Sequence, residues 1–404
     1  VLPNDPLFGN QWYLFNTGQG DGLDNEDIMA PEAWKIRSVS PDVVVGVIDT
    51  GIELTHPDLI NNIWENNNEI PDNGIDDDNN GYVDDLNGWN FPGNNKFPLA
   101  AEHGTHVGGT IGAQGDNNLG VTGVTWDVQL MSLDVFNGSE FYEEEDLLNA
   151  IYYAVDNGAN VINMSLGTSP IPGRYQDFQK DFPEQDQVYR NAFEHAVSNG
   201  ATVVIAAGNS QTSFDENYFT LPAVYSNLYD GVISVAAVSN TGDLSWYTNY
   251  GSQVTIAAPG GETNISDPAG IFNTVPINDY GSLQGTSMAS PVVTGSIALM
   301  LGENPYLNPA QVEAILKNTA FKYRSLDSLV ENGGYLNLEG ALQAAGASGD
   351  KTVVRLYNSS SGKHLFSSNK SEIDILVGDS WKNEGAFYYS PEEATAEVFR
   401  FYIS

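Results

Sequence analysis

Short runs of apolar residues recur along the chain, and each is followed by a turn and then by residues with helical spacing. The runs are nearly continuous in Val and Ile rather than alternating with polar residues, which is typical of strands buried on both faces. Because the spacers are long enough for helical crossovers, the pattern predicts an α/β fold with a doubly wound, mostly parallel sheet. The predicted strands are Val43–Ile48, Val128–Val135, Asn160–Leu166, Thr202–Ala207, Val232–Val238 and Val254–Ala258.

Helical periodicity follows several of these strands. Gly158 directly follows the predicted helix Asp146–Asn157, and Gly200 directly follows Val188–Asn199. Glycine is common at the position just after a helix. A last short helix is expected in the segment that begins at Gly334. The other predicted helices are Asp146–Asn157, Val188–Asn199, Ser287–Leu301 and Pro309–Asn318.

The pattern changes near the C-terminal end. Residues 347–350 are small and predict a linker, whereas residues 351–404 contain aromatic residues in short alternating runs and predict a small β-rich unit. The chain is therefore divided into a large domain, 1–346, and this unit. Arg355-Leu-Tyr recurs as Arg400-Phe-Tyr, which suggests a truncated second repeat. Binding to a surface polymer, binding to a partner and packing on the large domain remain open as roles for the unit.

Composition narrows the possible functions. The chain has 404 residues, 41 % hydrophobic and 17 % charged, and no apolar run of the roughly 18 to 20 residues that cross a bilayer. It has 15 Lys and Arg against 53 Asp and Glu, a net charge of −38, which argues against nucleic acid and anionic membranes as partners and favours cations. The absence of cysteine excludes thiol catalysis, thiolate zinc sites and disulfides, so bound metal is the candidate for cross-linking loops.

Polar residues follow three of the predicted strands at their carboxyl ends, where open α/β sheets bind ligands. Asp49, Ser165 and Asn209 occupy these positions. A Gly-rich segment begins at His103, and the stretch 285–291, Gly-Thr-Ser-Met-Ala-Ser-Pro, contains two serines before a long helix. Taken alone, that stretch is equally compatible with helix capping. With an Asp and a His it supplies the components of a charge-oriented nucleophile.

The order Asp, His, Ser is the one found in subtilisin. The four segments that carry these residues resemble, in order, the four signature blocks of the subtilisin-like serine proteases, over about residues 1–345. The segments are Asp49-Thr-Gly-Ile, His103-Gly-Thr-His-Val-Gly-Gly-Thr, Ala207-Gly-Asn209 and Gly285-Thr-Ser-Met-Ala-Ser-Pro291.

This resemblance implies a role for each residue. Ser287, rather than Ser290, would be the nucleophile at the helix N-terminus. His103 would accept its proton and pass it to the leaving amine, while Asp49 orients the imidazole. The amide of Asn209 and the N–H of Ser287 would stabilise the oxyanion.

The resemblance also implies where a peptide binds. The substrate would pair as an added strand along the edge that follows the third predicted strand, and the segment from Asn209 to Thr220 would line the main pocket. Thr168–Gln187 looks like an insertion that shapes the cleft, and Val292 replaces a family histidine without expected consequence. The predicted substrate-binding residues are Ser165, Leu166, Gly167, Ala207, Gly208 and Thr220.

An acidic loop predicts a calcium site. Within it, Asp76, Asp78 and Asn80 stand at positions 1, 3 and 5 of an EF-hand-type calcium pattern. Gly81 stands at position 6 and Asp84 at position 9. Asn87 stands at position 12, where the usual Glu is missing, so Asp85 would supply that carboxylate and Tyr82 its carbonyl. The alternative is a solvated acidic loop. The predicted ligands are Asp76, Asp78, Asn80, Tyr82, Asp84 and Asp85.

A second calcium site follows from the resemblance alone. The ion would lie between Asp5, Asp58 of the segment His-Pro-Asp, and the loop at residues 115–121. One inserted residue near Gly115 departs from the family pattern. Both sites would be structural and would protect the protease against self-digestion. The predicted ligands are Asp5, Asp58, Gly115, Asn117, Leu119 and Val121.

Together these features predict a secreted, calcium-stabilised serine endopeptidase that acts on proteins or peptides and is inhibited by a propeptide before maturation. One alternative is a metal-dependent hydrolase using His103 and His106, but the nearby Glu of such sites is missing. The other is a catalytically inactive peptide-binding protein on the same fold.

Overall fold

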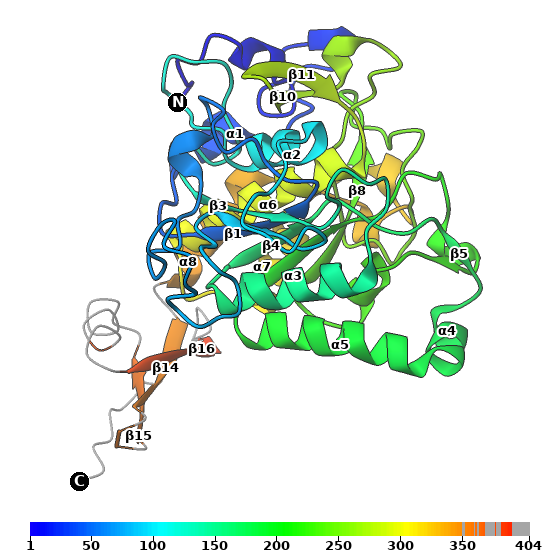
Figure 1. The fold of residues 1–404 in the computed structure, drawn as a ribbon. Coiled ribbons are helices and arrows are strands. Elements are labelled where there is room, and N and C mark those ends of the chain that lie inside the picture. Colours follow the sequence, from blue (N-terminus) through cyan, green and yellow to red (C-terminus); the bar gives the residue numbers. More distant parts are fainter. Residues whose placement is uncertain (350–351, 359, 362, 368–375, 377–380, 390–404) are drawn as a thin grey trace.

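A nine-stranded sheet forms the centre of the computed structural model, which describes residues 1–349, 352–358, 360–361, 363–367, 376 and 381–389 (Figure 1). The strand order is β12-β13-β9-β8-β6-β4-β1-β3-β2, and every neighbouring pair is parallel except β12 and β13. The predicted α/β fold with a mostly parallel sheet is therefore confirmed. The strands are β1 (Val44–Asp49), β2 (Gly88–Asn90), β3 (Gln129–Asp134), β4 (Val161–Met164), β6 (Thr202–Ala206), β8 (Val232–Val238), β9 (Ile256–Pro259), β12 (Phe321–Lys322) and β13 (Gly334–Tyr335).

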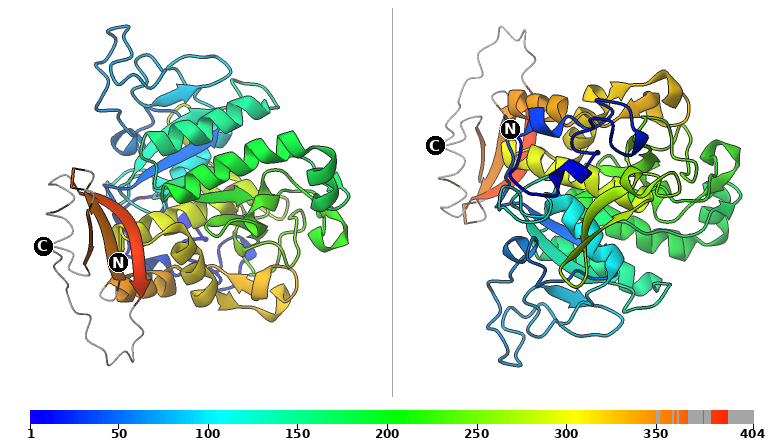
Figure 2. Two further views of the ribbon diagram at one scale, coloured as in Figure 1. Left: turned by 90° about the horizontal axis from the view of Figure 1, so that it is seen from below. Right: turned by 90° about the horizontal axis from the view of Figure 1, so that it is seen from above.

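Helices cover both faces of the sheet. Helices α3 and α5 pack with one hydrophobic core, and helices α2, α6, α7 and α8 pack with the other (Figures 1 and 2). The helices are α1 (Ala30–Ala33), α2 (Glu102–Gly112), α3 (Glu144–Asp156), α4 (Tyr175–Asp181), α5 (Pro183–Ser198), α6 (Thr286–Glu303), α7 (Pro309–Thr319) and α8 (Leu338–Gly349).

The strands send alternate side chains into the two cores, which explains their near-continuous hydrophobicity. In β6, Val203 and Ile205 pack in the core of α3 and α5, whereas Val204 packs in the core of α6. All seven residues of β8 are buried. Burial on both faces contributes roughly 25 cal/mol for each Å² of apolar surface removed from water, so the sheet carries much of the stability.

Helix α6 passes through the interior and is apolar on nearly every side, as expected of a helix surrounded by protein. Among its 18 residues, only Ser287, Gly302 and Glu303 are not buried. Val292, at the position where the family usually has a histidine, is 0 % exposed and packs in the core. A hairpin of β10 (Ile271–Val275) and β11 (Asp279–Leu283) leads directly into α6.

Three strands near the C-terminal end form a separate antiparallel sheet in the order β15-β14-β16, which lies beside the α/β body (Figure 2). They are β14 (Thr352–Asn358), β15 (Lys363–Ser367) and β16 (Lys382–Tyr389). Leu356 packs against Leu365, Leu376 and Trp381, and against Tyr306 of the large domain.

The predicted linker and repeat differ in how far the structure describes them. Helix α8 continues to Gly349, so residues 347–349 of the predicted linker are helical, as their alanine-rich surroundings allow. The proposed second repeat at Arg400 lies outside the described residues. Within the described ranges, no helix is long and apolar enough to cross a bilayer.

Candidate active site

An aspartate and a histidine meet at the carboxyl edge of the sheet. Asp49 is the last residue of β1 and is 1 % exposed, and His103 is the second residue of α2. His103 Nδ1 lies 2.7 Å from Asp49 Oδ1, and this oxygen also accepts the N–H of Thr50 at 2.7 Å. Because a carboxylate can only accept, Nδ1 carries the proton and Nε2 is left as the basic nitrogen. The His103 side chain is 36 % exposed, so a substrate can reach it.

Ser287 lies at the start of α6 and is partly exposed. Its Oγ donates to the backbone carbonyl of Ser165 at 3.1 Å. In the part of the chain that the structure describes, no hydrogen bond joins Ser287 to His103. A proton transfer between Ser287 and His103 would require the Ser287 side chain to rotate away from the Ser165 carbonyl, and hydrogen bonds of this kind commonly tighten only when a ligand binds.

A buried hydroxyl network fixes the start of α6 to the end of β4. Ser165 Oγ donates to the Ser287 carbonyl at 2.8 Å and lies 2.9 Å from Ser290 Oγ. Asn163 donates to Ser165 Oγ at 2.9 Å and accepts from Thr294 Oγ1 at 2.8 Å. Ser290 is 0 % exposed, so of the two serines only Ser287 can reach a substrate.

Two N–H donors flank one point beside Ser287. Asn209 Oδ1 accepts from both the N–H and the Oγ1 of Thr286, each at 2.9 Å, which directs the Nδ2 end away from Thr286. A Cβ placed on Gly285 would lie 3.4 Å from Asn209 Nδ2 and 3.6 Å from the backbone nitrogen of Ser287. Gly285 has a φ of +147°, which favours glycine, and its lack of a side chain leaves this point open.

The electrostatics of the two histidines in α2 differ. Burial lowers the pKa of His103, but the charge and hydrogen bond of Asp49 and the charge of Glu102 outweigh it, so the pKa is raised. Burial lowers the pKa of His106 to about 4, and its Nε2 lies 2.8 Å from the carbonyl of Ile271. His106 is therefore a neutral packing residue. Among the described residues, the one group of potential metal ligands contains neither histidine.

The predicted substrate-binding residues lie on two adjacent segments. Thr220 Oγ1 donates to the Ala207 carbonyl at 3.4 Å, and Gly208 accepts from the N–H of Asn249 at 2.8 Å. Leu166 is buried, whereas Gly167 is exposed beyond the end of β4. The two segments are thus held beside Asn209.

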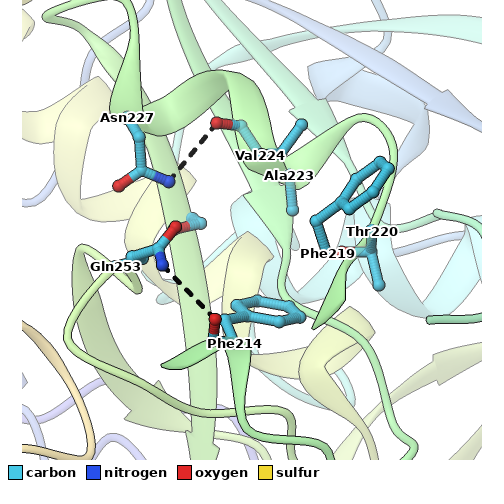
Figure 3. A pocket seen from close by; sticks show the side chains of 8 residues that line it. Phe214, Phe219, Thr220, Ala223, Val224, Asn227 and Gln253 are labelled. Atoms are coloured by element: carbon cyan, nitrogen blue, oxygen red, sulfur yellow. Dashed lines mark hydrogen bonds between the residues drawn. The ribbon is translucent and has the colours of Figure 1, made fainter. Parts of the chain in front are cut away.

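A small pocket adjoins Thr220 (Figure 3). Its lining is half apolar and half polar, and two side-chain amides make hydrogen bonds to backbone carbonyls beside it. The segment from Asn209 to Thr220 contributes part of this wall. Residues lining the pocket include Phe214, Phe219, Thr220, Ala223, Val224 and Gln253.

The profile of the Subtilase family matches residues 40–383, which is most of the chain. This chain belongs to the subtilase family. The matched range extends past the predicted large domain into residues 351–383. The resemblance seen in the sequence motifs is confirmed.

Individual subtilases support the same conclusion. Subtilisin DY of Bacillus licheniformis is 34 % identical over 75 % of this chain and 91 % of its own length. An extracellular protease of Xanthomonas campestris is 34 % identical over 85 % of this chain and 57 % of its own. A solved protease of Pseudoalteromonas arctica is similar with a TM-score of 0.63 and 30 % identity, covering 85 % of this chain and all of that one. The chain is thus a subtilase with the activity of a serine endopeptidase.

Three carboxylates of this subtilase converge beside the predicted calcium loop. One carboxylate oxygen from each of Glu69, Asp78 and Asp85 lies within 4.8 Å of the other two. Burial raises the pKa of Asp85 and the charge of Asp78 adds to it, while hydrogen bonds from Tyr153 and Asn80 oppose the rise. Clustered oxygen donors of this kind suit Ca²⁺.

Three further predicted ligands belong to the same loop, and of these Asn80 contacts the cluster directly. Asn80 Nδ2 donates to Asp78 at 3.2 Å and to Asp85 at 3.0 Å. Asp76 accepts the N–H of Asn80 at 3.1 Å, which holds the loop closed. The N–H of Tyr82 donates to Asn80 Oδ1 at 2.8 Å.

Asp84 is not brought into the cluster. Its carboxylate accepts the N–H groups of Asn73 and Gly74 and forms an ion pair with Lys96 at 3.1 Å. Burial opposes ionisation, but the contacts with Lys96 and Gly74 lower the pKa of Asp84 overall. The backbone of Asp84 is in the left-handed region, with a φ of +55°.

The residues of the second predicted calcium site also meet. Asp5 accepts the N–H groups of Asp116 at 2.8 Å and Asn117 at 3.2 Å. Asp58 accepts from Asn117 Nδ2 at 2.9 Å and from the N–H of Val121 at 3.0 Å. Burial raises the pKa of Asp5, and the charge of Asp58 adds to this effect, so a cation would stabilise the pair.

The loop that carries the other two predicted ligands is folded tightly. The N–H of Leu119 donates to Asn117 Oδ1 at 2.7 Å. A Cβ on Gly115 would lie 2.5 Å from Thr122 Oγ1, so this position requires glycine.

Glu69 is the functional candidate that the sequence motifs did not reveal. It accepts the N–H groups of Asp77 at 2.8 Å and Asp84 at 3.0 Å and is 5 % exposed. An EF-hand template begins at Asp76 and is read toward the C-terminus, so it does not include a ligand that precedes the loop. The missing carboxylate at position 12 was the only sequence signal that another acid was needed.

Proposed function

We propose that this subtilase hydrolyses peptide bonds through an acyl-enzyme on Ser287, with His103 as general base and acid and Asp49 as its orienting group. The observation that carries the proposal is the 2.7 Å contact between His103 Nδ1 and Asp49 at the edge of the sheet, because it leaves Nε2 basic. Ser287 stands at the N-terminus of the adjacent α6, where its N–H and Asn209 Nδ2 flank the same open point.

The chemistry follows from these positions. Ser287 Oγ rotates away from the Ser165 carbonyl and attacks the scissile carbonyl carbon, while its proton passes to His103 Nε2. The oxyanion takes hydrogen bonds from Ser287 N–H and Asn209 Nδ2. The C–N bond then breaks and His103 gives its proton to the amine that leaves. Water, deprotonated by His103, attacks the ester and releases the acid and Ser287.

The substrate would lie extended along the edge that follows β4, at Ser165, Leu166 and Gly167, with its backbone paired as an added strand. Ala207, Gly208 and Thr220 would face the side chain on the amino side of the scissile bond. The hydrogen bonds that hold these segments together support this placement. Proteins and peptides are thus the proposed substrates, and a propeptide would occupy the same edge before maturation.

We also propose two structural calcium sites and secretion. Glu69, Asp78, Asp85 and Asn80 would hold one ion, and Asp5, Asp58 and Asn117 the other. Calcium would supply positive charge that neutralises and cross-links these loops and would take no part in bond cleavage. Support for secretion comes from the similarity to the extracellular protease of Xanthomonas campestris.

Replacing Ser287 by Ala tests the proposal. We expect hydrolysis of casein to fall by roughly 10⁴-fold or more, a size established for the triad of subtilisin itself. Ser198→Ala is the control, since it removes an exposed hydroxyl at the end of α5 and leaves the network around Ser287 intact. A sulfonylating reagent should label Ser287 in the wild type, as read by peptide mass spectrometry. Equal activity of wild type and Ser287→Ala would contradict the proposal.

The same experiment separates the alternatives. A hydrolase that used His103 and His106 with a metal would retain activity in Ser287→Ala and resist the serine reagent. A catalytically inactive binding protein would show no hydrolysis in the wild type while still binding peptide. Chelation is unsuitable for this purpose, because removal of structural calcium would also inactivate a subtilase.

A further inference from the structure

The insertion at residues 168–187 is joined directly to the segment that precedes Thr220. It contains the short strand β5 (Ile171–Pro172), helix α4 and the start of α5. Strand β5 pairs antiparallel with β7 (Tyr218–Phe219), so Ile171 stands opposite Phe219. The insertion therefore lies directly against Phe219, which lines the pocket in Figure 3 together with Thr220.

One buried carboxylate ties the insertion to the other side of that wall. Asp186, in the first turn of α5, is 6 % exposed. It accepts hydrogen bonds from the hydroxyl of Tyr175, in α4, and from the hydroxyl of Tyr225 at 3.1 Å. Arg190, one turn along α5, donates its Nε at 2.6 Å. Each oxygen of Asp186 thus has a donor.

Tyr225 belongs to the short helix η5 (Ala223–Asn227), and its neighbours Ala223 and Val224 line the pocket. The ring of Tyr175 lies 5.9 Å from that of Phe219 and 5.7 Å from that of Tyr225, both edge-on. The two tyrosines that Asp186 binds therefore contact both sides of the pocket wall, one through Phe219 and one through η5.

The carboxylate is held ionised although it is buried. Burial raises the pKa of Asp186, but the hydrogen bonds from Tyr175, Arg190 and Tyr225 and the charge of Arg190 outweigh this, so the pKa is lowered. An ionised acceptor makes stronger hydrogen bonds than a neutral one. The contacts to both tyrosines are therefore maintained across neutral pH.

We infer that Asp186 is a positioning residue for substrate specificity, which holds the pocket wall beside Thr220 in place through Tyr175 and Tyr225. This inference rests on the proposed function, because Thr220 is taken to face the substrate. A substrate pocket discriminates between side chains that differ by one methylene by about 10- to 200-fold. A wall that can move to fit either side chain would weaken this discrimination. Loss of the Asp186 contacts would let η5 and β7 move apart and accept a wider range of side chains.

Tyr225→Phe tests the inference with the smallest change, since it removes only the hydroxyl that reaches Asp186. Tyr229→Phe is the matched control, because its hydroxyl donates to the backbone carbonyl of Arg190 at 3.4 Å and not to Asp186. Asp186→Asn, which keeps the size of the side chain, is the second variant. kcat and KM are measured on peptides that differ only in Ala, Leu or Phe on the amino side of the scissile bond.

The selectivity is the kcat/KM of the best peptide of this series divided by that of the poorest. We expect Tyr225→Phe and Asp186→Asn to reduce this ratio by about fivefold. The change should be mainly in KM, with kcat on the preferred peptide little changed. Tyr229→Phe should leave this ratio of kcat/KM values within about twofold of the wild-type ratio. If Tyr225→Phe lowers the melting temperature but leaves the ratio unchanged, Asp186 is only structural and the inference is wrong. If the wild type cleaves none of these peptides and no protein, the proposed function itself fails.

Discussion

The reactivity of His103 depends on the balance between its burial and the charges beside it. Burial by itself would lower the pKa of its imidazole, yet Asp49 and Glu102 raise it above the ordinary value of 6.5. His106, three residues further on, has no such partner and its pKa falls to about 4. The pKa values of two histidines in one helix thus shift in opposite directions, because one imidazole faces a carboxylate and the other a backbone carbonyl.

The pH dependence of activity follows from this balance. Only a neutral imidazole can act as a base, so kcat/KM should rise as pH increases through the pKa of His103. Because that pKa is raised from the ordinary value of 6.5, the midpoint of the rise should lie above pH 6.5. Glu102→Gln removes one raising charge and should move the midpoint to lower pH. Glu145→Gln, an exposed charge change in α3, is the control and should leave it in place. A wild-type midpoint at or below 6.5 would contradict the assignment.

The side chain of Asn209 allows a second test at this scale. Its Oδ1 is held by Thr286, so Nδ2 is available to an oxyanion. Asn209→Ala should lower kcat by about 10²–10³ with little change in KM, a size established for the corresponding change in subtilisin. Steady-state kinetics on a peptide ester and amide would measure it. A rise in KM with unchanged kcat would show that Asn209 binds substrate rather than the transition state.

The predicted calcium loop shows how the structure of a segment differs from its sequence motif. The EF-hand-type pattern predicts ligands only at Asp76 and at residues that follow it in the sequence. Glu69 precedes the pattern, yet its carboxylate lies beside those of Asp78 and Asp85. Asp84 stands at a position that the motif favours but turns toward Lys96. The ammonium group of Lys96 and the backbone N–H groups of the loop bind Asp84, so its carboxylate is not left for a metal ion.

Removal of Glu69 should weaken calcium binding at this loop. We expect Glu69→Gln to lower the affinity by about tenfold or more, which corresponds to about 1.4 kcal/mol. Isothermal titration calorimetry in a Ser287→Ala background avoids self-digestion. Glu65→Gln is the control, because Glu65 is exposed and lies outside the cluster. Equal effects of the two substitutions would indicate that only net charge matters and that Glu69 is no ligand.

At the scale of the whole molecule, the net charge of −38 opposes folding through self-repulsion. In the described residues, acidic side chains greatly outnumber the ion pairs that could neutralise them. The fold offsets this repulsion with two apolar cores, one on each face of the sheet, and with no disulfide. Stability should therefore respond to salt as well as to calcium.

Thermal unfolding at saturating calcium tests this expectation. An increase in NaCl from about 10 mM to about 500 mM shortens the Debye length from about 30 Å to a few Å and should raise the melting temperature. Choline chloride at equal ionic strength is the control, since it screens charge in the same way. A shift with NaCl alone would indicate sodium binding, and no shift with either salt would contradict the role of self-repulsion.

The sequence by itself determined the α/β architecture and the order of the catalytic motifs, because buried strands require continuous apolar runs and each motif is a local pattern. The choice of Ser287 over Ser290 came from family resemblance, and burial gives the physical reason: one side chain faces solvent and the other the core. Only the tertiary structure decided that Glu69 completes the acidic cluster, that Asp84 leaves it, and that Asp186 joins two sides of a pocket. These contacts link residues whose separation along the chain follows no period, so they depend on how loops pack and on which donors lie within reach.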